Sequence, residues 1–103
     1  MKDFYNKAHD YIASNQSIID LIERETVQLE KDITAMWIAG YVQRELEKYT
    51  GRKKFDDENV GRLAIESLCI TQSIDKHWVD FSKFDSFLIN AYKVGYNTRD
   101  NEG

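Results

Sequence analysis

Residues 17–49 constrain the fold more than any other part of this chain of 103 residues. Within this stretch, apolar or small residues recur at alternating spacings of three and four positions. This seam consists of Ile19, Ile22, Thr26, Leu29, Ile33, Met36 and Gly40. Such spacing places the seam on one face of a helix, which packs that face against a neighbour. The pattern predicts a single long central helix or two helices in line. In the second case Asp32 would cap the second helix after a break between residues 29 and 34.

The face opposite this seam changes character along the stretch. It is charged in its first half, at residues 23–25 and 30–32. It becomes apolar in its second half, through Trp37, Ile38, Tyr41 and Val42. A helix that is apolar on nearly all sides must be covered by other helices or by another molecule. We therefore predict that these four residues contact a partner protein or a second copy. Flanking helices should leave Trp37, Ile38 or Val42 accessible, with Trp37 as the anchor.

Similar evidence predicts helices before and after this stretch. Residues 3–14 form a short amphipathic helix, and Ser17 with Asp20 resembles a capping box for the central helix. Gly51 follows the end of that helix, where a left-handed residue is favoured, and Asp56 is placed to cap the next one. The helix after Asp56 has the clearest repeat in the chain: Val60, Leu63, Ala64, Leu68, Thr71, Ile74 and Trp78, widened by Ile65 and Ile70.

The last predicted helix begins at Ser82, which with Asp85 resembles another N-cap, and ends at Gly95. Residues 1–96 would then be a single helical domain, and residues 97–103 a flexible polar tail. The chain has no proline and only five glycines, and it lacks the alternation of period two that is typical of strands. The predicted fold is all-α, an antiparallel bundle of four to five helices with one long central helix.

Composition narrows the class of protein. Hydrophobic residues make up 42% of the chain and aromatic residues 13%, which is ample for a packed core. No apolar run approaches the ~18 residues of a membrane span, and the first residues lack the apolar segment of a signal peptide. The single cysteine, Cys69, cannot form an internal disulfide. We therefore expect a cytoplasmic protein.

The residue types that carry most enzyme chemistry do not form a catalytic or metal-binding pattern. His9 and His77 lack the spacing that places two metal ligands on one helical face. Asp20 with Glu23 is the nearest match to a paired-carboxylate motif, and it occurs once. Cys69 is expected to be a buried and inert thiol, and His77 to be partly buried. The sequence predicts no enzyme activity, no cofactor and no metal.

One basic cluster could contact nucleic acid. It consists of Arg52, Lys53 and Lys54, with Arg62 one turn into the next helix. Three acidic residues, at positions 56–58, follow at once and partly cancel its field, and the net charge of the chain is −4. We therefore expect only weak binding to DNA or RNA.

Taken together, these features predict a small non-catalytic protein-binding module that occludes or bridges a partner protein. Its size and class are those of inhibitor, immunity and adaptor proteins, including ones that phages and mobile elements encode. Two alternatives stay open. The chain could be a homodimeric structural protein paired through the heptad seam, or a weak nucleic-acid binder that uses the basic cluster.

Overall fold

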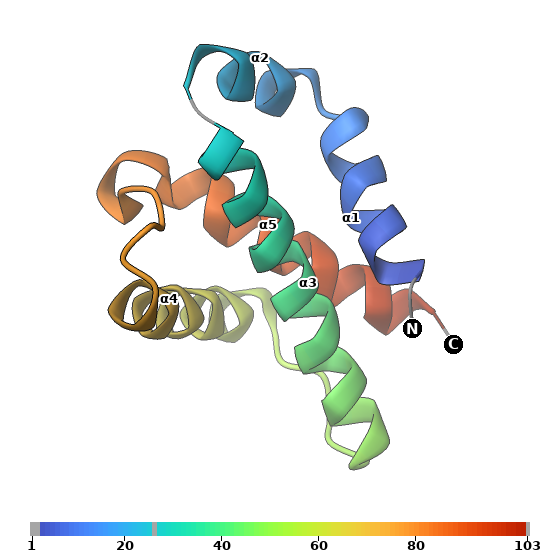
Figure 1. Ribbon diagram of the computed structural model, residues 1–103. Coiled ribbons are helices and arrows are strands. Elements are labelled where there is room, and N and C mark those ends of the chain that lie inside the picture. Colours follow the sequence, from blue (N-terminus) through green and yellow to red (C-terminus); the bar gives the residue numbers. More distant parts are fainter. Residues whose placement is uncertain (1–2, 26, 103) are drawn as a thin grey trace.

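The computed structural model describes residues 3–25 and 27–102, which form five helices and no strand (Figure 1). They are α1 (Asp3–Ala13), α2 (Gln16–Arg24), α3 (Val27–Tyr49), α4 (Asp57–Ile74) and α5 (Phe81–Asn101). The longest of the five, α3, lies at the centre with the others around it. The predicted all-α bundle with one long central helix is therefore confirmed.

The stretch of residues 17–49 forms two helices, and the break comes earlier than predicted. α2 ends at Arg24 and α3 begins at Val27, so the chain turns before residue 29. Thr26, which was assigned to the seam, lies outside the described residues. Because α2 turns away from the line of α3 (Figure 1), the seam does not continue through both helices.

Asp32 lies inside α3 and does not cap a helix. Its side chain is buried, although residues 30–32 were expected to form a charged outer face. Its carboxylate accepts hydrogen bonds from the backbone N–H of Val79 at 2.8 Å and from the side-chain amide of Gln28 at 2.8 Å. Asp32 therefore attaches the loop between α4 and α5 to the central helix.

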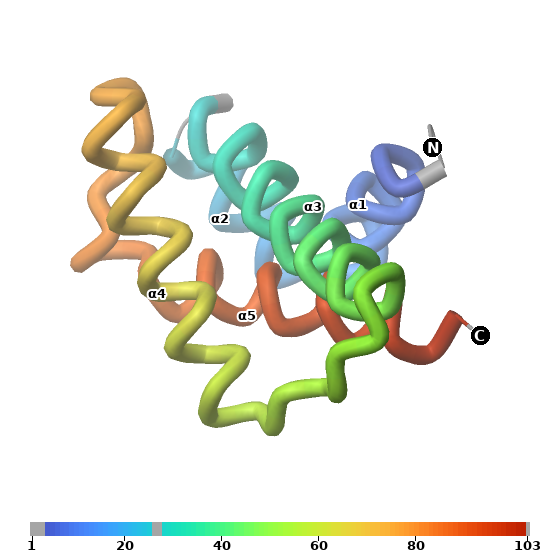
Figure 2. Tube along the Cα trace, turned by 90° about the horizontal axis from the view of Figure 1, so that it is seen from below, coloured from blue at the N-terminus to red at the C-terminus, as the bar shows by residue number. Residues whose placement is uncertain are grey.

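The core is centred on the crossing of α3 and α5, with α1 on one side and α4 on the other (Figure 2). Gly40 of α3 meets the backbone of Tyr92, and Gly95 of α5 meets the backbone of Trp37. A Cβ atom at either glycine would lie 2.9 Å from the facing carbonyl carbon and would overlap its oxygen. Glycine at both positions therefore allows the two backbones to touch.

The seam residues of α3 are buried in this core. Leu29, Ile33 and Met36 pack there with residues of the other helices, including Ile18, Val60, Ala64, Leu68, Leu88, Ala91 and Tyr96. Because helices of the same chain cover the seam, it is not available to a second copy. The homodimer that was predicted through this seam would have to use another surface.

Gly95 does not end the last helix. Its lack of a side chain serves the crossing with α3, and α5 continues to Asn101. Most of the residues predicted as a flexible tail, 97–103, are therefore helical. Beyond the helix, the Glu102 carboxylate pairs with Lys7 and accepts a hydrogen bond from the Tyr41 hydroxyl at 2.5 Å. Only Gly103 of this segment lies outside the described residues.

Two of the predicted helix-end signals are confirmed. Gly51 has a φ of 76°, and its N–H donates to the carbonyl of Lys48 at 3.2 Å. The N–H of Arg52 donates to the carbonyl of Glu47 at 2.7 Å, which completes a Schellman motif. Asp56 caps α4 by accepting a hydrogen bond from the N–H of Asn59 at 2.9 Å.

The two predicted serine caps are wrong. α2 is capped by Asn15, whose side chain accepts a hydrogen bond from the N–H of Ile18, and not by Ser17. α5 is capped by Asp80, which accepts a hydrogen bond from the N–H of Ser82 at 2.9 Å. Asn and Asp are as effective as Ser at this position, and each lies two residues before the serine. Both helices therefore begin earlier than the serines suggested.

A buried polar network fixes the last turns of α5 against α3. The Glu47 carboxylate is buried and accepts hydrogen bonds from the Tyr96 hydroxyl, from Gln43 at 2.9 Å and from Arg44 at 3.3 Å. Arg44 also pairs with Asp100 at 2.9 Å. Burial, followed by the hydrogen bond to Glu47, raises the pKa of Tyr96 to about 12. These groups therefore satisfy one another inside the fold.

Candidate protein-interaction site

The four residues that were predicted to bind a partner divide between two faces of α3. Trp37 is 1% exposed and Tyr41 8% exposed, and their rings stack on each other with centroids 5.4 Å apart. The ring of Phe4, from α1, lies 6.1 Å from that of Tyr41. The expectation that Trp37 stays accessible as an anchor is therefore wrong, because α1 and α5 cover the side of α3 on which it lies.

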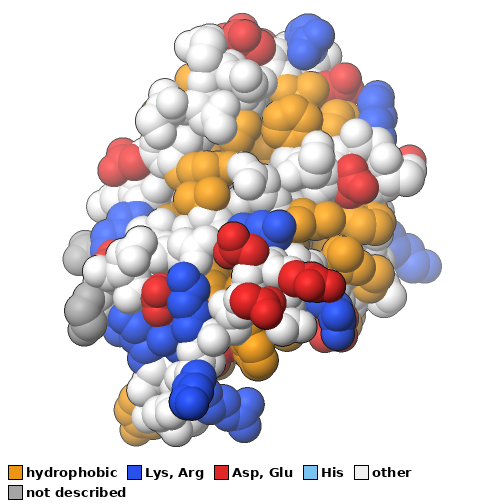
Figure 3. Space-filling view, turned by 180° about the vertical axis from the view of Figure 1, so that it is seen from behind, with side chains coloured by type: hydrophobic (Ala, Val, Ile, Leu, Met, Phe, Trp, Pro, Cys, Tyr) orange, Lys and Arg blue, Asp and Glu red, His pale blue; other side chains and the backbone are white. Residues whose placement is uncertain are grey.

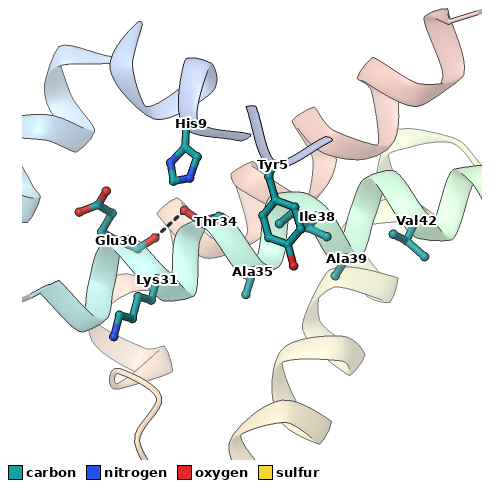
Figure 4. A pocket seen from close by; sticks show the side chains of 9 residues that line it. All are labelled: Tyr5, His9, Glu30, Lys31, Thr34, Ala35, Ile38, Ala39 and Val42. Atoms are coloured by element: carbon teal, nitrogen blue, oxygen red, sulfur yellow. Dashed lines mark hydrogen bonds between the residues drawn. The ribbon is translucent and has the colours of Figure 1, made fainter. Parts of the chain in front are cut away.

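Ile38 and Val42 remain at the surface, where they line a groove between α1 and α3 (Figure 4). The groove has a volume of about 760 Å³. Tyr5 and His9 of α1 border it on one side, and α3 provides the rest of the lining through Glu30, Lys31, Thr34, Ala35, Ile38, Ala39 and Val42. Two of the four predicted residues are thus placed together in a concave surface.

The lining of this groove is mainly apolar, with charges at one end. The Thr34 hydroxyl donates to the carbonyl of Glu30 at 2.9 Å, so its one donor is used within the helix. Glu30 and Lys31 lie at the N-terminal end of the groove, and His9 lies above them on α1 (Figure 4). An apolar surface with a few polar groups at its end suits the side chains of another protein.

The groove belongs to a longer apolar surface, which we call the outer face of α3. It consists of Ala35, Ile38, Ala39, Val42, Leu46 and Tyr49. Apart from Ile38, these positions are spaced four, three, four and three residues apart, so they form a second heptad-like stripe. Leu46 is 56% exposed and Tyr49 90% exposed. Leu46 and Tyr49 were not among the predicted site residues, although their spacing from Val42 follows the same rule.

Several apolar residues of α4 are also exposed. Val60, Ala64 and Leu68 are buried as predicted, but Ile65, Ile70 and Ile74 are exposed. α4 packs mainly against α5 alone, so one neighbour covers only part of its wide apolar arc. Cys69 points away from the core as well, which corrects the expectation of a buried thiol. None of these α4 residues lines the groove between α1 and α3.

The predicted nucleic-acid residues lie at the surface. Arg52, Lys53 and Lys54 are exposed in the loop after α3, and Arg62 is exposed on α4. Lys54 forms an ion pair with Asp100 of α5 at 3.2 Å, a contact that the sequence did not reveal. Figure 3 shows that basic side chains gather toward the projecting lower end of the rear face, with acidic side chains in its middle. The cluster is therefore smaller and more neutralised than its three consecutive cations suggest.

The residues that were considered for catalysis are dispersed. His77 is exposed in the loop after α4, where its backbone N–H donates to Asp75, so the expected partial burial is wrong. His9 borders the groove from α1. Across residues 3–25 and 27–102, His, Cys, Asp and Glu side chains do not gather in any group of three or more that could hold a metal ion. The described helices likewise include none that is long and apolar enough to cross a membrane.

No protein-family model, no curated protein and no solved structure matches this chain.

Proposed function

We propose that this chain is a small non-catalytic protein-binding module that receives an apolar helix of another chain on the outer face of α3. It would act by occluding or bridging the protein that carries this helix, as inhibitors, immunity proteins and adaptors do. The observation that supports this function is the second apolar stripe of α3 from Ala35 to Tyr49, which is half-buried beside α1 as far as Val42 and exposed at Leu46 and Tyr49.

The shape of the surface favours a helical ligand. An amphipathic helix presents apolar residues at spacings of three and four, which match the spacing of the stripe. Ala35 and Ala39 are small, so another backbone can approach closely, while Tyr5 on α1 forms a lateral wall. Each Val, Leu or Ile side chain that becomes fully covered contributes about 1.5–3 kcal/mol, and the entropy of association offsets part of this gain.

A test begins with a displayed library of amphipathic helical peptides selected against the purified protein. We expect the selected peptides to perturb the NMR signals of Ile38, Ala39 and Val42, and Val42→Asp to abolish their binding. Placing a carboxylate at the centre of the contact would bury an unpaired charge. Leu46→Asp, at a more exposed position of the outer face, should weaken binding without a risk to folding.

Ile70→Asp on α4 is the matched control, because it introduces the same charge at an exposed isoleucine away from the outer face. It should leave peptide binding unchanged, and thermal melting should show that all three variants are folded. Selected peptides that bind the Val42→Asp and Leu46→Asp variants as tightly as the wild type would contradict the proposed function.

A further inference from the structure

The outer face of α3 changes from small to large side chains along its length. Its N-terminal half contains Ala35 and Ala39 and opens into the groove beside α1. Its C-terminal half contains Leu46 and Tyr49, which are 56% and 90% exposed. Val42 lies between the two halves. One chain therefore presents both a hollow and a pair of protruding apolar side chains on a single helix.

We propose that the helix received by this face is α3 of a second copy, packed antiparallel about a two-fold axis near Val42. This inference rests on the proposed function, because it uses the same face. It identifies the helix that binds there as α3 of the second copy. Leu46 and Tyr49 of each copy would lie over Ala35 and Ala39 of the other. A two-fold interface requires a surface that is complementary to itself, and a hollow and a protrusion on either side of the axis meet this requirement.

The dimensions of α3 agree with this arrangement. The 15 residues from Ala35 to Tyr49 span roughly 21 Å of helix, because their Cα atoms are separated by 14 steps of 1.5 Å. Residues at equal distances from Val42, such as Ala35 and Tyr49, face each other in an antiparallel pair. Large side chains opposite small ones interdigitate, whereas a parallel pair would place Tyr49 against Tyr49 and leave both grooves unfilled.

Charge also favours the antiparallel direction. Beyond Tyr49, the chain carries the exposed cations Arg52 and Lys53, and the acidic residues 56–58 follow at the start of α4. At the opposite end of the face, α2 and the first turns of α3 carry Asp20, Glu23 and Glu30 against Arg24 and Lys31 outside the core, while Glu25 between the two helices pairs with Lys83 of α5 at 3.6 Å. An antiparallel pair brings each basic end to an acidic end. A parallel pair would place the two basic ends side by side.

Cysteine cross-linking of the full chain tests both the occupant and its direction. In a Cys69→Ser background, which removes the exposed native thiol, Val42→Cys should form a disulfide-linked dimer under mild oxidation. Ala35→Cys and Tyr49→Cys should each form no disulfide-linked dimer when oxidised alone, but an equimolar mixture of the two should cross-link. A disulfide requires the Cα atoms to approach within about 7 Å, which only the antiparallel register allows for this mixed pair. Cross-linking of Ala35→Cys with itself would overturn the antiparallel arrangement.

Sedimentation measures the association without a cross-link. The wild type should show a reversible dimer within roughly 1 μM to 1 mM, the range of small interfaces. Leu46→Glu with Tyr49→Glu should raise the dimer dissociation constant at least about tenfold, and both sites are exposed enough for the variant to fold. Ile74→Glu, at an exposed isoleucine of α4, should change nothing.

The same experiments separate this inference from the proposed function. Selected helical peptides should compete with the dimer, so their addition should convert it to peptide-bound monomers. If the wild type is monomeric throughout the concentration range and still binds these peptides on the outer face, the inferred homodimer is wrong. The proposed function then stands. If neither dimer nor peptide binding occurs there, both are wrong.

Discussion

Asp32 has a larger role than its place in a charged run of the sequence suggested. Its side chain is buried, and its carboxylate accepts a hydrogen bond from the N–H of Val79. One side chain therefore attaches the loop between α4 and α5 to the central helix. Burial is the main cause that raises the pKa of Asp32, and the hydrogen bonds from Val79 and Gln28 oppose it. The structure therefore requires the oxygen atoms of Asp32 more than its charge.

This difference predicts opposite outcomes for two substitutions. Asp32→Ala should lower the free energy of unfolding by about 1–3 kcal/mol, because the partly buried N–H of Val79 loses its acceptor. Asp32→Asn keeps an acceptor oxygen and removes the buried charge, and Gln28 can turn its own amide oxygen toward the new amide. It should therefore be at least as stable as the wild type at neutral pH, as measured by urea unfolding.

The pH dependence of stability, compared between the wild type and Asp32→Asn, provides a further check. A raised pKa means that the folded protein binds the proton of Asp32 more tightly than the unfolded chain does. The contribution of Asp32 to the free energy of unfolding should thus fall as pH rises from the ordinary carboxyl pKa through the raised one. The difference between Asp32→Asn and the wild type should shrink as pH is lowered through this window. An Asp32→Asn protein as unstable as Asp32→Ala would show that the charge itself is needed.

Among the helices, α3 and α5 determine the architecture through their glycines. Gly40 and Gly95 lie at the crossing, where a Cβ would meet rigid backbone. Gly61 of α4 offers a contrast, because a Cβ there would lie 3.2 Å from the Cε atom of Lys93, the mobile end of a long side chain. The same residue type therefore serves close packing in two helices and is replaceable in a third.

We predict that Gly40→Ala or Gly95→Ala lowers the free energy of unfolding by about 3 kcal/mol or more, because the helices must separate to admit one methyl group. Gly61→Ala should instead raise it by up to about 1 kcal/mol, since alanine is the better helix former and Lys93 can move. Urea unfolding of the three variants measures both effects. A Gly40→Ala protein with wild-type stability would rule out the close crossing.

In the molecule as a whole, charge is mixed and slightly negative. The net charge is −4, and Lys54 of the basic loop is already paired with Asp100. We expect binding of DNA or RNA to be no tighter than about 10⁻⁵ M at physiological salt, in the range of nonspecific association. Fluorescence anisotropy with labelled oligonucleotides measures this. Sub-micromolar binding that Arg52→Glu with Lys53→Glu abolishes would establish the nucleic-acid alternative instead.

Packing between distant parts of the chain explains why only part of the candidate site was predictable. Ile38 and Val42 were identified because α3 is apolar on more faces than one neighbour can cover, and they do line the groove. Trp37 and Tyr41 belong to the same stretch, yet α1 and α5 bury them. The contribution of α1 to the groove, through Tyr5 and His9, depends on contacts between residues far apart in the chain, for which the sequence contains no local signal.

Local patterns in the sequence were sufficient to determine the helical class, the long central helix, the cap at Asp56 and the left-handed turn at Gly51. Each depends on interactions within a few residues, so spacing and residue type are enough to identify it. The tertiary structure alone decided the burial of Trp37 and Asp32, the exposure of Cys69 and Ile74, and the role of Gly95. A residue on an apolar arc is buried only where another helix approaches, and a glycine ends a helix only where no neighbour needs the space of its missing side chain.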